Sequence, residues 1–242
     1  MPVITVASDV FLPSLARHLA DRLTQHPRVV LGVASGATTF KGLAALRDIV
    51  LTEQLSLRHV HLMPVEIGVG LPVSHRFAFA NVVRQFLQPG TDLPDAHIHS
   101  FEDAAASGPV LCQRYSEALT ALGGFTIVLL GVGGNGHIAA IEPGSALPTR
   151  TYVSRLAPET VADMPPDFAG FEQVVTPGMA DLLAADEVII AANGLKKQAA
   201  AAAVGYGQLD PQWPLTFFLA HPHATFLFDT EACPAEPAIA GI

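Results

Sequence analysis

The sequence predicts an α/β fold, a doubly wound, mainly parallel sheet with helices on both faces, in a single domain over residues 1–242. Two observations predict this class. Short apolar runs, typical of strands buried on both faces, alternate along the chain with segments of helical periodicity. No repeat, low-complexity segment or linker divides the chain, and its length suits one large domain.

Composition narrows the classes of partner and the expected compartment. Half of the residues are hydrophobic, only 14% are charged and the net charge is −9, so the sequence predicts a large core and few polar groups outside a site. The longest basic cluster is Lys196–Lys197, which argues against nucleic acid or an anionic membrane as partner. Two distant cysteines, no signal peptide and no apolar run of membrane-spanning length predict a cytoplasmic protein.

In the first half of the chain, strands and helices are expected in turn. The expected strands are 3–7, 29–33 and 59–65, with a possible short one at 97–101. The expected helices are 9–25 with Asp9 as its N-cap, a helix with Leu43, Leu46 and Ile49 on one face, a helix ending near Leu87, and 103–121 opening at Asp103.

The second half continues this alternation after one interruption. Strands are expected at 127–130, 187–192, 216–219 and 225–228, and helices at 179–184 and 196–204. Residues 147–171 carry four prolines and no clean periodicity, so this stretch is interpreted as an irregular excursion. Such an excursion is either a lid or binding loop, or a plain surface covering.

A glycine-rich loop follows the apolar strand 127–130. It contains Gly133, Gly134 and Gly136 and places Asn135 and His137 among them, with Glu142 shortly after. Glycine permits sharp turns and close approach of a ligand, and open α/β sheets bind ligands where such loops leave the carboxyl ends of strands. A histidine in such a loop is, taken alone, more often structural than catalytic.

A second turn of small residues follows the strand 29–33. Ser35, Gly36, Ala37 and Thr38 stand between this strand and a helix, which is the general form of a phosphate-binding turn. A plain strand-to-helix turn favours the same residue types, so the two readings are equally supported by this segment.

Two charged residues are expected beside the same crevice. Glu66 follows a strand, and Lys197 lies in the first turn of a helix, where a cation is unfavourable for the helix dipole. A local conflict of that kind often marks a functional position. The simpler reading of each residue is a solvated surface charge.

Four separated segments resemble the glucosamine-6-phosphate deaminase/isomerase family, which also includes galactosamine-6-phosphate isomerases and, more distantly, 6-phosphogluconolactonases. These segments are GVASGAT at 32–38, the stretch 66–72 ending in VGLP, GVGGNGHIAAIEPGS at 131–145, and the tail 218–229. The order and spacing fit nearly the whole chain. The EPGS ending favours the amino-sugar isomerases over the lactonases, and the resemblance implies a Rossmann-like α/β fold.

The resemblance also implies roles for individual residues. Glu66 matches the proton-shuttle aspartate of the family with one more methylene group, and His137 matches its ring-opening histidine. Glu142 matches the carboxylate that orients or charges this histidine, while Asn135 stands where the family commonly has aspartate and the galactosamine-6-phosphate branch has asparagine. The implied phosphate site combines the 35–38 turn with Lys197.

One cation of the family pattern is missing. Many members keep a phosphate-binding arginine at the place that aligns near Pro165, and no arginine stands there. Arg150 and Arg155 lie nearby in sequence without matching that place. A 6-phosphate would therefore need another contact.

The function that follows from the resemblance is conversion of an amino-sugar 6-phosphate to a ketose 6-phosphate with release of ammonia. Galactosamine-6-phosphate is slightly preferred over glucosamine-6-phosphate. The expected enzyme uses neither metal nor cofactor, takes a small sugar phosphate, and is a monomer or homo-oligomer. Two alternatives stay open, a 6-phosphogluconolactonase-like hydrolase and a sugar-phosphate-binding protein with impaired catalysis.

Overall fold

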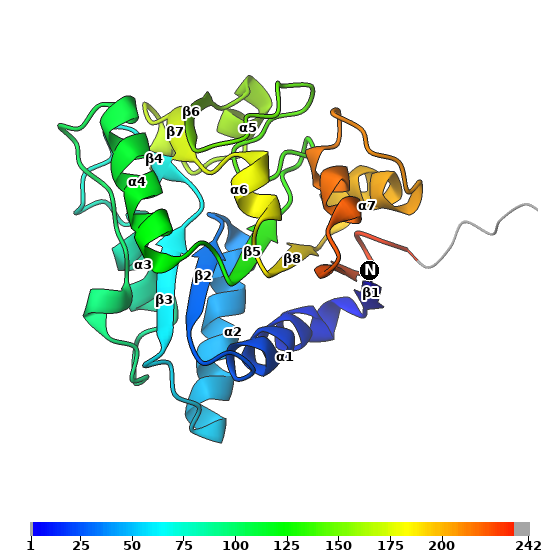
Figure 1. Cartoon of the computed structure of the whole chain (residues 1–242). Coiled ribbons are helices and arrows are strands. Elements are labelled where there is room, and N and C mark those ends of the chain that lie inside the picture. Colours follow the sequence, from blue (N-terminus) through cyan, green and yellow to red (C-terminus); the bar gives the residue numbers. More distant parts are fainter. Residues whose placement is uncertain (1, 235–242) are drawn as a thin grey trace, which may run out of the picture.

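The computed structural model describes residues 2–234, and the two ends of the expected 1–242 domain lie outside them. A six-stranded sheet forms its centre, in the order β1-β9-β8-β5-β2-β3 (Figure 1). Its strands are β1 Val3–Val6, β2 Val29–Val33, β3 Val60–Pro64, β5 Ile127–Gly131, β8 Glu187–Ala192 and β9 Ala224–Asp229. Every pair of neighbours in this sheet is parallel.

Helices cover both faces of this sheet, which confirms the doubly wound α/β prediction. One face packs against α1 Phe11–Leu23, α2 Ala37–Glu53 and α3 Phe79–Phe86. The other packs against α4 Gly108–Leu122, α6 Met179–Leu183 and α7 Gln198–Gly205. Alternate side chains of β5 enter the two cores, Ile127 and Leu129 on the first face and Val128 and Leu130 on the second. This explains why β5 is an unbroken apolar run in the sequence.

A second, three-stranded antiparallel sheet lies near the carboxyl end of β3 (Figure 1). It consists of β4 Ile67–Gly68, β7 Gln173–Thr176 and β6 Tyr152–Arg155. A short helix, α5 Pro158–Ala162, and a 3-10 turn, η3 Pro166–Phe168, connect β6 to β7. The expectation of an irregular excursion over 147–171 is therefore wrong, because part of it is a strand of this sheet.

Other element predictions are also corrected. Residues 216–219 form part of the 3-10 helix η5 Pro214–Ala220, not a strand. Residues 97–101 follow the 3-10 turn η2 Asp95–His97 and make only an isolated bridge from Ile98 to Leu62. Asp9 lies in the 3-10 turn η1 Ser8–Val10 and makes no capping bond. Asp103 precedes α4 by several residues and accepts a hydrogen bond from Arg114.

Within residues 2–234, no helix has the length and apolar character that crossing a membrane requires.

Candidate active site

The carboxyl ends of four adjacent strands hold the predicted site residues. The chain passes from β2 outward to β3 and then returns to the other side of β2 as β5, which makes a topological switch point between β2 and β5. Crevices at such points are the usual ligand sites of open α/β sheets. The 35–38 turn leaves β2, Glu66 follows β3, the glycine loop leaves β5, and Lys197 follows β8.

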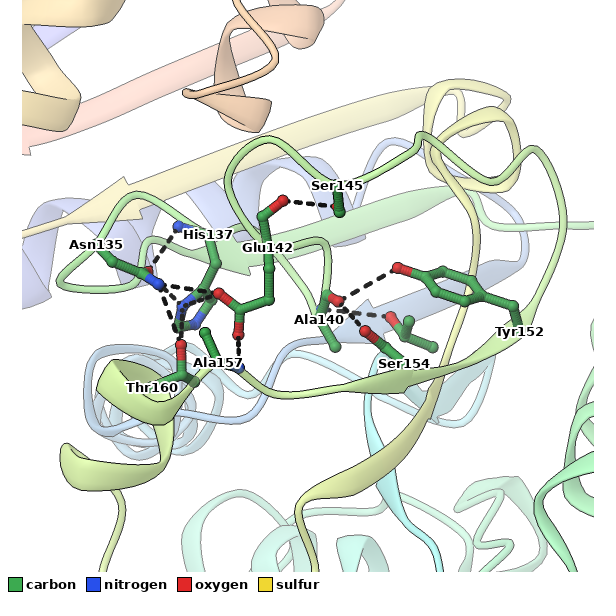
Figure 2. Close-up of polar contacts among 10 residues, drawn as sticks. Asn135, His137, Ala140, Glu142, Ser145, Tyr152, Ser154, Ala157 and Thr160 are labelled. Carbon is green, nitrogen blue, oxygen red and sulfur yellow. Dashed lines mark hydrogen bonds and ion pairs between the residues drawn. The ribbon is translucent and has the colours of Figure 1, made fainter.

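Asn135, His137 and Glu142 form one hydrogen-bonded network in the glycine loop (Figure 2). Nδ1 of His137 lies 2.8 Å from Oδ1 of Asn135, and Nδ2 of Asn135 donates to Oε2 of Glu142 at 2.9 Å. The backbone N–H of His137 donates to the same Oδ1 at 3.1 Å. Oε2 of Glu142 lies 3.9 Å from Nδ1 of His137, so the amide of Asn135 stands between the ring and the carboxylate.

These contacts fix the amide orientation of Asn135 and the tautomer of His137. The carboxylate of Glu142 only accepts hydrogen bonds, so the group facing it is the NH₂ of Asn135. The other end of the amide, which faces the backbone N–H of His137, is consequently the oxygen. Nδ1 must then carry a hydrogen to meet that oxygen at 2.8 Å. In the neutral ring this leaves Nε2 unprotonated and able to accept a proton.

Two groups complete the network, one on α5 and one just before it, and neither was predicted from the sequence. Oγ1 of Thr160 lies 3.1 Å from Nδ1 of His137 and accepts from Nδ2 of Asn135 at 3.3 Å. The backbone N–H of Ala157 donates to Oε1 of Glu142 at 3.0 Å. Thr160 is 23 residues from His137 in sequence, in a stretch without periodicity, so no local pattern connects the two.

Gly133 and Gly136 are required by close packing in the loop. A Cβ on Gly133 would lie 2.2 Å from Nδ1 and Cε1 of His137, so the imidazole occupies the space that any side chain would fill. A Cβ on Gly136 would lie 2.4 Å from Cε3 of Trp213, and Gly136 also has a φ of +92°. The ring of Trp213 therefore packs directly on the loop one residue before His137. A Cβ on Gly134 would lie 2.8 Å from Oδ2 of Asp163, at the end of a side chain that can move away.

Between His137 and Glu142, the backbone of the loop is strained at one residue and fixed by hydrogen bonds at the next. Ala139 has a φ of 51°, in the left-handed region that costs a non-glycine residue energy. The next carbonyl, of Ala140, accepts hydrogen bonds from Oγ of Ser154 at 2.6 Å and from the hydroxyl of Tyr152 at 3.3 Å (Figure 2). Both donors belong to β6, so the small sheet fixes the spacing between His137 and Glu142.

The carboxylate of Glu66 is partly buried and points toward the 35–38 turn. Its Oε2 accepts a hydrogen bond from the backbone N–H of Ser35 at 2.6 Å. Burial raises the pKa of Glu66 to about 7, although the hydrogen bonds from Ser35 act in the opposite direction. A carboxyl group with a pKa near neutrality can both take and return a proton.

The 35–38 turn opens α2, a helix of 17 residues without a side-chain cap. The first N–H groups of such a helix lack partners in the helix and attract anions. The N–H of Ser35 is already bonded to Glu66, and the hydroxyl of Thr38 donates to Oδ1 of Asn193 at 2.7 Å. The backbone N–H groups of Gly36, Ala37 and Thr38 are therefore placed to bind an anion, while the hydroxyl of Thr38 ties this turn to the one after β8.

Lys197 ends the 3-10 turn η4 Leu195–Lys197, immediately before α7. Gly194, with a φ of +88°, begins this turn, and its N–H donates to the buried carboxylate of Asp229 at 3.0 Å. Burial lowers the pKa of Lys197, while Asp163 raises it. The neighbouring Lys196 forms an exposed ion pair with Asp163 at 3.1 Å.

The charges around His137 act against one another. Burial lowers the pKa of His137, and the positive charge of Lys197 lowers it further. The carboxylates of Glu142 and Asp163 raise it. The imidazole therefore stays neutral at neutral pH and carries its free lone pair on Nε2, while Lys197 lies close enough to influence its charge.

The residues near the missing arginine do not supply an obvious replacement. Arg150 donates to Asp181 at 3.2 Å, and Arg155 lies on β6 with an exposed side chain. In the described part of the chain, no group of three or more His, Cys, Asp or Glu side chains could hold a metal ion.

Comparison with known proteins gives the family. The sequence model described as glucosamine-6-phosphate isomerases/6-phosphogluconolactonase matches residues 7–227. The chain belongs to this family. The matched region contains the small sheet, all of the predicted site residues and the main sheet except β1 and the end of β9.

Individual members of the glucosamine-6-phosphate isomerase/6-phosphogluconolactonase family are similar to this chain over most of their length. A glucosamine-6-phosphate deaminase of Mycolicibacterium smegmatis is 31% identical over 238 residues, covering 96% of this chain and 91% of that protein. A glucosamine-6-phosphate deaminase of Streptomyces coelicolor is 33% identical over 225 residues, covering 90% of this chain and 85% of that protein.

Solved structures agree on the fold. A monomeric glucosamine-6-phosphate deaminase superposes with a TM-score of 0.88 at 25% identity, covering 96% of this chain and 98% of that one. The 6-phosphogluconolactonase of Trypanosoma brucei superposes with a TM-score of 0.77 at 22% identity, covering 95% of this chain and 96% of that one. At this identity the similarity shows a shared fold and no more.

Proposed function

We propose that this protein is an amino-sugar-phosphate isomerase/deaminase that converts glucosamine-6-phosphate to a ketose 6-phosphate and ammonia. One observation carries the proposal: Asn135 and Glu142 hold His137 with Nδ1 protonated and Nε2 free. This is the state that a ring-opening base requires. Relatives that are 31% and 33% identical and are named glucosamine-6-phosphate deaminase support the choice of substrate.

His137 opens the sugar ring in this proposal. Its free Nε2 accepts the proton of the C1 hydroxyl and returns it to the ring oxygen as the C1–O bond to that oxygen breaks. During this exchange the imidazole becomes cationic for a moment, and Oδ1 of Asn135 keeps its bond to Nδ1–H. The carboxylate of Glu142, 3.9 Å from Nδ1, stabilises the positive charge.

Glu66 then moves a proton between C2 and C1 of the open sugar. It takes the proton from C2 while the aldehyde oxygen takes up the proton that the ammonium group at C2 loses, which gives an enol-amine, and it then delivers its own proton to C1. The resulting imine at C2 is hydrolysed, so the nitrogen leaves as ammonia and C2 becomes the ketone. A pKa of about 7 suits Glu66 to both halves of this transfer, because it accepts and releases the proton with little bias.

The phosphate is assigned to the start of α2. The N–H groups of Gly36 and Ala37, the helix dipole and the ammonium group of Lys197 together provide the donors and positive charge that a phosphate needs. The hydrogen bond from Thr38 to Asn193 keeps the two turns together at 2.7 Å. This arrangement compensates for the arginine that the chain lacks near Pro165.

The direct test measures ammonia and ketose phosphate from purified protein with glucosamine-6-phosphate and, separately, with galactosamine-6-phosphate. We expect turnover of the first and its loss in His137→Gln. Asn135 is the feature that favours the galactosamine epimer, so a higher kcat/KM for that epimer would change the assigned substrate. A folded protein that releases ammonia from neither sugar would overturn the proposal.

Lactone hydrolysis is the second candidate. It needs only a base for water, and the free Nε2 of His137 supplies one without Glu66. The observation in its favour is that Glu66 differs in length from the shuttle aspartate. Accelerated opening of 6-phosphogluconolactone that survives Glu66→Gln, without ammonia release from either amino sugar, would select this candidate.

A further inference from the structure

Thr160 reaches the candidate active site from outside the glycine loop. It lies on α5, the residue is 8% exposed, and Oγ1 lies 3.1 Å from Nδ1 of His137. The same oxygen accepts a hydrogen bond from Nδ2 of Asn135 at 3.3 Å. Because Nδ1 carries a hydrogen in this network, two donors face the hydroxyl oxygen, and its two lone pairs can accept both.

The Nδ1–H group of His137 faces acceptors on two elements, Asn135 in the glycine loop and Thr160 on α5. Oδ1 of Asn135 accepts from Nδ1–H at 2.8 Å and also from the backbone N–H of His137 at 3.1 Å, so it is shared between two donors. Glu142 is too far from Nδ1, at 3.9 Å, for a direct hydrogen bond. Thr160 is therefore the second acceptor beside Nδ1–H, and it is also the link between the ring and α5.

We propose that Thr160 is a positioning residue that holds His137 in the Nδ1–H tautomer and makes this alignment depend on the docking of α5. A second contact supports the coupling, since the N–H of Ala157, just before α5, donates to Glu142 at 3.0 Å. The connection between β6 and β7 thus contacts both His137 and Glu142. The kinetic consequence rests on the proposed deaminase function, whereas the tautomer does not.

Other charged groups also face His137. Glu142 comes from the same loop, Lys197 from the turn after β8, and Asp163 from the end of α5. All three are unchanged when Thr160 is replaced. A difference between variants at this position therefore reports the hydroxyl group and not the surrounding charges.

The test compares Thr160→Val, which keeps the shape and loses the hydroxyl, with Thr160→Ser, which keeps the hydroxyl. We expect Thr160→Val to lower kcat about fivefold, the effect of one hydrogen bond, with KM changed less than twofold. The pH midpoint assigned to His137 should fall by about half a unit, because an acceptor for the cationic ring is lost. Thr160→Ser should restore both values.

A second measurement is independent of turnover. Imidazole ¹⁵N shifts report the tautomer of His137, whose signals are assigned by their absence in His137→Gln. We expect the Nδ1–H form in the native protein and a mixture of tautomers in Thr160→Val, with Thr160→Ala as the second variant if the valine protein does not fold. A native-like tautomer and pH midpoint in both variants, or a serine variant as impaired as valine, would overturn the proposal. Absence of turnover in the native protein would overturn only the deaminase function.

Discussion

Replacing Gly133 with alanine tests how tightly the site holds His137. The added Cβ would lie 2.2 Å from Nδ1 and Cε1 of the imidazole and 2.6 Å from its Cγ. Ordinary contact between such atoms begins at about 3.5 Å, so the ring must move by more than about 1 Å. That movement breaks the 2.8 Å contact of Nδ1 with Asn135. A misplacement of about 1 Å costs roughly a hundredfold in rate.

The backbone of Gly133 does not explain such a loss, because its φ lies outside the left-handed region. We therefore expect kcat for ammonia release to fall about a hundredfold while the thermal unfolding midpoint changes little. Gly205→Ala is the matched control, since its Cβ meets no atom within 4 Å and it lies far along the chain at the end of α7. A Gly133→Ala protein that keeps more than about a tenth of the native kcat would refute the steric argument.

Substitutions at three further positions test the charges and the strain of the site. Glu66 is ionised only above a pKa of about 7, so kcat/KM should rise through that pH. Because the unfolded chain loses this proton near 4.5, stability should fall as pH rises from 4.5 to 7, and thermal unfolding of Glu66→Gln should lack that component. Asn135→Asp places a carboxylate 2.9 Å from Glu142, so the pKa of His137 should rise by about one unit or more in an NMR titration; an unchanged midpoint would contradict the assigned network. Ala139 has a φ of 51°, so Ala139→Val should lower the free energy of unfolding in urea by more than about 2 kcal/mol. Ala139→Gly should stay within about 0.5 kcal/mol of the native protein, because glycine adopts this conformation without strain. Equal losses in the two variants would argue against backbone strain.

Most of the main sheet could be predicted because its strands are recognisable from the local sequence alone. The central strands are buried on both faces, so the predicted runs 29–33 and 187–192, the second apolar after Glu187, match β2 and β8 residue for residue. The same reasoning failed at 216–219. A short apolar run has the same composition in a buried 3-10 helix as in a strand, and the alternative is decided by packing against α7.

The small sheet could not be predicted for a different reason. β6 pairs with β7 about twenty residues later, and β7 pairs with β4 about a hundred residues earlier, so the strands are defined by distant partners. Tyr152–Arg155 shows no clean alternation because this strand is only partly buried. The same limitation hid Thr160, whose connection with His137 exists only after β6 and β7 have placed α5.

The residues nominated from the glycine loop do come together, and the structure adds how they are arranged. Sequence reasoning assigned Glu142 the task of setting the charge of His137. The structure puts the amide of Asn135 between them, so Asn135 contacts Nδ1 of His137 directly and Glu142 acts through Asn135. The turn at 35–38 is also more specialised than expected, because the N–H of Ser35 binds Glu66 and leaves the N–H groups of the next three residues for an anion.

The packing of Trp213 on Gly136 gives the protein an intrinsic optical reporter. Trp213 is the only tryptophan in the chain, so tryptophan emission comes from a single indole. That indole touches the backbone one residue before His137. Any ligand that shifts the glycine loop must alter the surroundings of this fluorophore. Stopped-flow fluorescence can therefore time the arrival of a sugar phosphate and separate it from the chemical steps that follow, without an added label.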